Sequence, residues 1–265
     1  MTLVLGLTAQ DGVIMVADGQ ATAGNGGTST RTATQKLTAV HDRIVFGAAG
    51  AAGLRQRIEE LLQTHLTPED CGLPISELRV KLISIVGHVQ FQGIREFRSV
   101  SPMSRHYGIS VLFGGVDDNG SPWLFEITPE GESEIHLKAE AIGSGRPYAR
   151  YALMSAEHYR LSERDLARVR LLGYRAVDDA IRTAAEALGE PIGMYEVTQD
   201  GARCMSHEDL QGVRQAVQSW QAAERAIFMG DSGQWLADGG GGSPPTSEPG
   251  IDPGVSAPSA VDAPS

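Results

Sequence analysis

The sequence predicts an α+β fold, a four-layer αββα sandwich in which two antiparallel sheets lie between helical layers. Apolar, β-branched segments occur in pairs around turn residues, which is typical of hairpins. Longer stretches with helical periodicity follow them in pairs. The order of strands, helix pair, strands and helix pair favours layered packing, because each sheet must bury one face against helices.

In the first third of the chain, residues 3–7 and 13–17 form a predicted hairpin around Asp11-Gly12. Residues 36–40 and 43–48 form a second one, with an exposed His41 at its turn. Between the hairpins, residues 22–34 are polar, small and glycine-containing, which predicts a loop or irregular edge beside a cleft.

The remaining elements follow from the same signals. Turn residues at 117–120 predict a third hairpin, and Ser162 is the expected N-cap of a long helix. The predicted helices span 51–66, 75–89, 147–159, 163–188 and 206–228, and the predicted strands span 110–116, 123–127, 134–142, 194–198 and 202–205.

The composition changes near residue 229. We predict one domain over residues 1–228 and a disordered tail over 229–265, because the tail is rich in Gly, Pro and Ser and has few large apolar residues to offset its ordering entropy.

Charge and cysteine content restrict the function. A net charge of -11 argues against nucleic acid as a partner. Cys71 and Cys204 stand far apart without a CxxC or His/Cys cluster, so we expect no metal site and no disulfide framework. No stretch approaches the roughly 20 apolar residues of a membrane span, and Asp11 interrupts the apolar N-terminus, so we expect neither a membrane span nor a signal peptide. The cysteine content favours a reducing cytoplasm as the location.

Thr2 is the candidate nucleophile. Removal of Met1 would give Thr2 a free α-amine beside its own hydroxyl. An α-amine titrates at roughly 7.7 to 8.0, so near neutrality it can act as the base that a threonine hydroxyl needs. A lysine held charged by a carboxylate would tune that amine, and Lys36 and Asp18 are the candidates. Gly50, before a predicted helix, is the candidate oxyanion donor.

Four blocks of sequence, in family order, resemble proteasome β-type subunits and the related bacterial heat-shock-locus peptidase. They are TLVLGLTAQDGVIMVADGQATAGN, QKLTAVHDRIVFGAAGAAG, SVLFGGVDDNGSPWLFEI and AIGSGRPYARYAL. The resemblance implies the αββα fold and a threonine endopeptidase of the N-terminal nucleophile class that needs no cofactor and no metal.

The resemblance also implies residue roles. Thr2 would be nucleophile and base, Asp18 and Lys36 its charge partners, and Ser144 the hydrogen-bond partner of the terminal amine. Gly50 would donate to the oxyanion. The S1 pocket would be lined by Ala21, Ala48 and Ala52, with Thr22 and Gly50 offering backbone to an extended peptide. A homo- or hetero-oligomeric ring and an ATP-dependent unfoldase would be the partners, and proteins or peptides the substrates.

One segment departs from the family pattern. The family carries an aspartate and a serine after its fourth helix, whereas residues 188–193 read LGEPIG. Glu190 is a possible replacement for the acid but is not counted as catalytic. Two alternatives stay open: a non-catalytic ring or scaffold subunit, and an amidohydrolase of the same nucleophile class that acts on a small amide.

Overall fold

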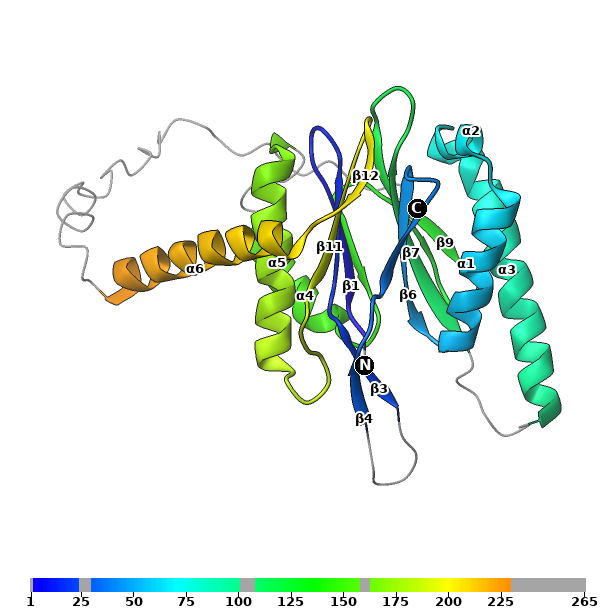
Figure 1. Cartoon of the computed structure of the whole chain (residues 1–265), viewed down its shortest axis with the longest axis horizontal. Helices are drawn as coiled ribbons and strands as arrows, with labels where there is room; N and C mark the ends of the chain where they lie inside the picture. Colours follow the sequence, from blue (N-terminus) through cyan, green and yellow to red (C-terminus); the bar gives the residue numbers. More distant parts are fainter. Residues whose placement is uncertain (1, 24–29, 101–107, 158–162, 230–265) are drawn as a thin grey trace, which may run out of the picture. The chain divides into compact units, whose positions relative to one another are not determined.

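The computed structural model describes residues 2–23, 30–100, 108–157 and 163–229 (Figure 1). The chain divides into two compact units, residues 1–219 and residues 220–265. Only the last turns of one helix are described in the second unit. The predicted boundary at residue 228 stays a prediction, and the predicted tail lies outside the described residues apart from Met229.

The first five-stranded sheet, called sheet I, carries the N-terminus. Its strands are antiparallel and lie in the order β10-β1-β2-β11-β12. Strands β1 and β2 form the predicted first hairpin, and both are fully buried. Their bounds are Ala139–Ile142 (β10), Val4–Thr8 (β1), Val13–Ala17 (β2), Gly193–Thr198 (β11) and Gly201–Cys204 (β12).

The second five-stranded sheet, sheet II, has the order β5-β6-β7-β8-β9 and is also antiparallel. The β5–β6 turn places His41 and Asp42 at φ 48° and 52°, the left-handed conformation that tight hairpin turns require. The strand bounds are Leu37–Val40 (β5), Ile44–Gly50 (β6), Ile109–Val116 (β7), Pro122–Ile127 (β8) and Ser133–His136 (β9).

Helices cover the outer faces of the two sheets, as the sequence predicts (Figure 1). Helices α1 and α3 pack on sheet II, and α4 and α5 pack on sheet I. The helices are α1 (Ala52–His65), α2 (Pro68–Cys71), α3 (Ile75–Val100), α4 (Arg146–Glu157), α5 (Leu166–Thr183) and α6 (His207–Met229). Within the described residues, no helix is both long and apolar enough to cross a membrane.

Apolar side chains fill the space between the sheets and the space under α1 and α3. The layer between the sheets contains Val4, Met15 and Ala17 of sheet I and Leu37, Val45, Ala49 and Leu112 of sheet II. Phe46, Phe113 and Phe125 of sheet II face α1 and α3, together with Leu54 and Leu82 of those helices. Burial on both faces holds each sheet in place, so residues at strand ends have defined positions.

Three local predictions differ from the structure. Residues 22–34 are not wholly a loop, because β3 (Gln20–Ala23) pairs with β4 (Thr30–Ala33) as a separate two-stranded sheet. The predicted strand 134–142 is two strands, β9 in sheet II and β10 in sheet I. Helix α5 begins after Asp165, whose side chain accepts from the backbone N–H of Arg168, whereas Ser162 lies outside the described residues.

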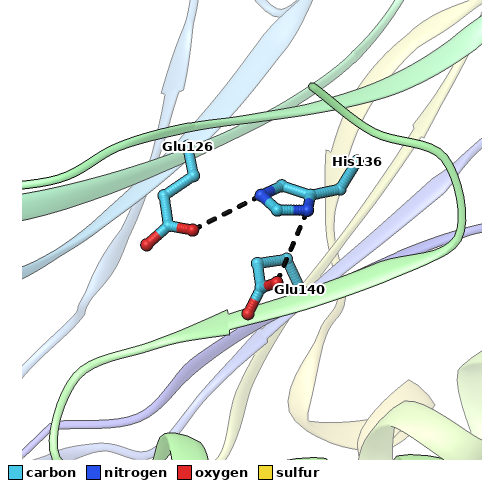
Figure 2. A group of neighbouring side chains, drawn as sticks. All are labelled: Glu126, His136 and Glu140. Carbon is cyan, nitrogen blue, oxygen red and sulfur yellow. Dashed lines mark ion pairs between the residues drawn. The ribbon is translucent and has the colours of Figure 1, made fainter. Parts of the chain in front are cut away.

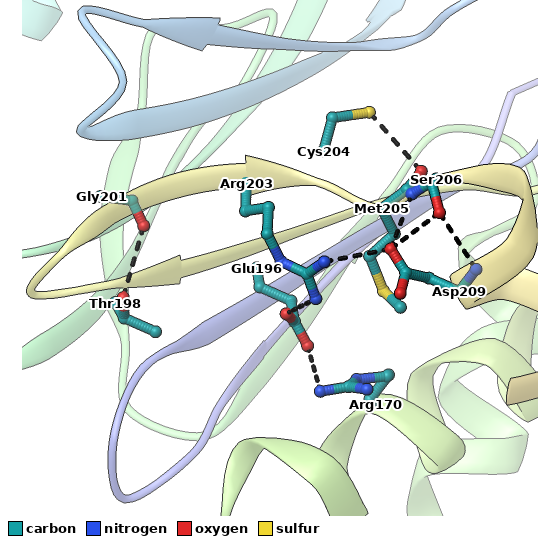
Figure 3. Close-up of polar contacts among 9 residues, drawn as sticks. All are labelled: Arg170, Glu196, Thr198, Gly201, Arg203, Cys204, Met205, Ser206 and Asp209. Carbon is teal, nitrogen blue, oxygen red and sulfur yellow. Dashed lines mark hydrogen bonds and ion pairs between the residues drawn. The ribbon is translucent and has the colours of Figure 1, made fainter. Parts of the chain in front are cut away.

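The hairpin of β11 and β12 is tied to α5 and α6 by ion pairs (Figure 3). Glu196 on β11 forms ion pairs with Arg170 of α5 and with Arg203 of β12, the latter at 2.7 Å. Arg203 also reaches Asp209 in the first turn of α6 at 3.0 Å. These contacts fix the far edge of sheet I away from the N-terminus.

Candidate active site

Thr2 lies two residues before Val4, the first residue of β1, so its position is set by sheet I. Val4 pairs with Ala17 on β2 and with Ile142 on β10. The two residues before Val4 thus continue between the ends of both neighbouring strands. Thr2 is half-buried, and Leu3 beside it is fully buried.

The end of β2 brings Asp18 to this position. The backbone N–H of Leu3 donates to Asp18 Oδ1 at 2.8 Å, and the Asp18 N–H donates to the Leu3 carbonyl at 3.2 Å. The backbone N–H of Gln20 donates to Oδ2 at 3.3 Å. Asp18 is 1% exposed, so these donors replace the water that its carboxylate lacks.

Lys36 approaches the same carboxylate from the start of β5. Its Nζ donates to Asp18 Oδ1 at 2.6 Å. One oxygen atom therefore joins the lysine to the residue that follows Thr2. Burial lowers the pKa of Lys36 from its ordinary value, although Asp18 acts in the opposite direction through its hydrogen bond and its charge. A lysine of this kind holds its proton less firmly than a surface lysine does.

The loop of residues 143–145 contacts Thr2 from the end of β10. The Thr2 backbone nitrogen donates to Ser144 Oγ at 3.3 Å, and the Gly145 N–H donates to the Thr2 carbonyl at 3.0 Å. Gly143 has φ +90°, and a Cβ added there would lie 2.2 Å from the Thr2 carbonyl oxygen. Both glycines permit an approach that a side chain would prevent.

Gly50 ends β6 just before α1. It is exposed, with φ +141°, and an added Cβ would lie 2.3 Å from the Gly108 carbonyl oxygen. The preceding residue, Ala49, lies near Thr2, because a Cβ on Gly143 would contact both the Thr2 carbonyl and the Ala49 Cβ, the latter at 3.0 Å. The structure therefore brings the end of β6 to the same loop as Thr2.

The residues predicted to line a substrate pocket lie on three elements. Ala21 is half-buried on β3, and Thr22 follows it on the same strand. Ala48 on β6 is 7% exposed and belongs to the core under α1 and α3. Ala52 is exposed at the first residue of α1. Their role in binding a substrate stays a prediction.

Glu190, the possible replacement acid, lies in a loop that reaches the Asp18 turn. The Gly19 N–H donates to the Gly189 carbonyl at 2.8 Å. The Glu190 carboxylate itself accepts from the Ile192 N–H at 3.4 Å and lies 3.9 Å from Arg214 on α6. Neither of these contacts links the Glu190 carboxylate to Thr2.

Three contributions to the site were missed from the sequence. The backbone N–H of Leu3 binds Asp18, and both glycines that flank Ser144 contact the Thr2 carbonyl. The two glycines are visible in the sequence, but a Gly-Ser-Gly triplet is common in simple turns and so does not by itself indicate a contact with Thr2. Only the pairing of β10 with β1 reveals what this triplet touches.

Together these residues hold the half-buried Thr2 with its backbone nitrogen at the Ser144 hydroxyl, and the adjacent Leu3 at the buried Asp18–Lys36 pair. If the nitrogen became a free amine, hydroxyl and base would belong to one residue, and Ser144 and the lysine would orient and tune the amine. No metal or redox group is required for such acyl transfer.

Known proteins resemble this chain both in sequence and in fold. A family model described as "Proteasome subunit" matches residues 2–190. The proteasome subunit beta of Methanococcus maripaludis is 27% identical over 224 residues, which cover 80% of this chain and 90% of that protein. The proteasome subunit beta 1 of Streptomyces avermitilis is 30% identical over 216 residues, which cover 76% of this chain and 70% of that protein.

Solved structures of similar fold include two proteins named Anbu. Anbu (ancestral beta-subunit) from Yersinia bercovieri has a TM-score of 0.64 at 17% identity. Anbu from Hyphomicrobium sp. strain MC1 has a TM-score of 0.62 at 21% identity. Each match covers 86% of this chain and 97% of the other. At these identities the likeness concerns the fold, which is the predicted sandwich of two sheets between helices.

Proposed function

The chain belongs to the proteasome subunit family, and from this premise we propose that it is a threonine-type endopeptidase with Thr2 as its N-terminal nucleophile. The observation that carries the proposal is the hydrogen bond of 3.3 Å between the Thr2 nitrogen and Ser144 Oγ, one residue from the buried Asp18–Lys36 pair. The proposal requires removal of Met1, which frees the Thr2 amine.

The reaction begins with attack of the Thr2 hydroxyl on a peptide carbonyl carbon. The free amine takes the hydroxyl proton as the C–O bond forms, and returns it to the leaving amine as the C–N bond breaks. An ester on Thr2 results. Water then attacks this ester, the same amine takes the water proton, and the carboxylic acid leaves with the Thr2 hydroxyl restored.

The surrounding residues act on this amine and on the oxyanion. Lys36, held by Asp18, disfavours a second positive charge on the amine and so keeps the amine unprotonated and able to accept the hydroxyl proton. Ser144 orients the amine. The backbone N–H of Gly50 would donate to the oxyanion, because the end of β6 lies beside the Thr2 loop.

We further propose that the substrate is an unfolded protein or peptide, bound as an added strand beside Thr22, with its P1 side chain between Ala21, Ala48 and Ala52. Such small residues leave room for a bulky apolar side chain. Relatives named as proteasome subunits support assembly with other subunits into a ring. We propose in addition that this ring lies in the cytoplasm and has an ATP-dependent unfoldase as partner.

The decisive experiment is the substitution Thr2→Ala. We expect peptide hydrolysis to fall about 10³-fold or more, since the nucleophile is lost, while assembly measured by sizing stays intact. Thr2→Ser keeps a hydroxyl and should retain activity. Thr64→Ala, which removes an exposed hydroxyl on α1, is the matched control and should hydrolyse peptides at the wild-type rate. Undiminished hydrolysis by Thr2→Ala would overturn the proposal.

A non-catalytic ring or scaffold subunit is the second candidate. It is favoured by the contacts of Glu190 with Ile192 and Arg214, since no acid then replaces the aspartate that the family carries after its fourth helix. Intact mass spectrometry separates the two candidates. A mature protein that still carries Met1 has no free Thr2 amine and would be the scaffold subunit.

A further inference from the structure

Three side chains that the proposed reaction does not use, two of them buried and one half-buried, form a group outside the Thr2 site (Figure 2). The His136 ring lies between two carboxylates, with Nε2 at 3.3 Å from Glu126 and Nδ1 at 3.4 Å from Glu140. Both carboxylates are almost fully buried, at 4% and 6% exposure. Charged groups at such depth require partners.

Two arginines of α4 complete the group. Arg146 bridges both carboxylates, with 3.6 Å to Glu126 and 3.0 Å to Glu140. Arg150 reaches Glu140 at 3.2 Å. We call these five residues the His136 cluster. Each carboxylate already faces a guanidinium, so a divalent cation would meet nearby positive charge. The cluster is therefore an ion network and not a metal centre.

The His136 cluster joins three layers of the fold at one point. Glu126 lies on β8 and His136 on β9, both in sheet II, whereas Glu140 lies on β10 in sheet I. Arg146 is the first residue of α4. The cluster thus connects both sheets to the helix where the chain passes from one sheet to the other.

The Ser144 loop lies between two members of this cluster. Glu140 precedes the loop on β10, and Arg146 follows it directly. The Arg146 N–H donates to the Gly143 carbonyl at 3.0 Å, and the Gly145 N–H donates to the Thr2 carbonyl at 3.0 Å. A guanidinium that spans two buried carboxylates therefore anchors the loop at the end that contacts Thr2.

We propose that Arg146, held by Glu126 and Glu140, is a positioning residue that fixes the Ser144 loop against Thr2. The role in catalysis rests on the proposed function, but the anchoring itself does not. Without the anchor, Ser144 Oγ would still reach the Thr2 nitrogen in part of the population, so the reaction would slow without a change in the groups that perform it.

The experiment measures amide hydrogen exchange of residues 143–146 in the full chain, together with peptide hydrolysis. In Arg146→Met we expect this segment to exchange about tenfold faster, with β7 and β8 unchanged. We also expect kcat to fall about tenfold at a KM within about twofold of wild type, because positioning and not binding is lost. Arg168→Met removes an exposed arginine of α5 and serves as the control with unchanged exchange and activity.

Arg146→Lys separates loss of the anchor from misfolding, because it keeps the positive charge beside the two carboxylates. A single ammonium cannot span the two carboxylates as a guanidinium does, so exchange should lie between that of wild type and Arg146→Met. Wild-type exchange in both variants would overturn the proposal. Faster exchange spread equally over β7 and β8 would also overturn it, since Arg146 would then be merely structural. Amide hydrogen exchange can be measured whether or not the protein hydrolyses peptides, so it tests the anchoring alone. The peptidase proposal is tested separately, by the hydrolysis assay of Thr2→Ala.

Discussion

Two buried groups of charges lie near the Ser144 loop, and they differ in which effect controls the pKa of the cation. At the Thr2 site, the Lys36 ammonium donates to the Asp18 carboxylate, which also accepts backbone N–H groups. Burial then prevails, and the pKa of Lys36 is lowered. In the His136 cluster, the imidazole has a carboxylate on either side, and its pKa is raised, chiefly by Glu126.

The difference teaches that burial alone does not decide the charge of a group. What decides it is whether the carboxylates around a cation stabilise its charge by more than burial destabilises it. The two groups should therefore respond to rising pH in opposite directions. A lowered lysine pKa costs stability that is regained as pH rises toward 10.5, whereas a raised histidine pKa adds stability that is lost as pH rises above 6.5.

The largest effect is expected from Lys36→Met, which leaves the Asp18 carboxylate buried without its cation. The free energy of unfolding should fall by about 3 to 5 kcal/mol, and peptide hydrolysis should be lost with it. Arg57→Met is the matched control, because it breaks an exposed ion pair with Glu96 and should cost no more than about 1 kcal/mol. Denaturant unfolding of both variants measures the difference. A variant Lys36→Met with full activity would make the lysine merely structural.

Gly143→Ala tests the loop between the two groups. The methyl group would lie 2.2 Å from the Thr2 carbonyl oxygen at a φ of +90°. We expect a loss of stability of about 2 to 4 kcal/mol and a strong loss of hydrolysis. Gly131→Ala is the control for backbone strain alone, since its φ is +88° with nothing near the added Cβ, and it should cost about 1 kcal/mol. Denaturant unfolding measures both losses of stability. Equal losses for the two variants would mean that the loop moves away from the added methyl group without further cost.

The smallest effect concerns the pH dependence of the His136 cluster. The groups that face His136 are Glu126, Glu134, Glu140, Arg146 and Arg150. Because the folded pKa is raised, the stabilisation by His136 is complete below 6.5 and is lost as pH rises through the folded value. His136→Gln should therefore cost on the order of 1 kcal/mol at pH 6 and much less at pH 9. Thermal unfolding of wild type and variant across that range measures it, and a constant difference would contradict the charge assignment.

Hairpins and helices could be predicted because their signals are local. Turn residues such as Asp11-Gly12 and the helical spacing of Leu54 and Ile58 act over a few residues, and the elements follow them closely. His41 shows the limit of such reasoning. We expected it to be exposed, yet it is half-buried, and its Nε2 donates to the Leu66 carbonyl at 2.8 Å, a contact with a residue 25 positions away.

The sequence by itself determined the layered fold and the choice of Thr2, Asp18 and Lys36 as candidates, because hydrophobic periodicity and residue chemistry are properties of the chain alone. Only the tertiary structure decided that residues 133–142 divide between two sheets. That division places His136 and Glu140 side by side, and Arg146 over both Glu126 and Glu140. Contacts of this kind depend on which strand ends lie side by side in the fold, and the separation of two residues in the sequence does not predict this.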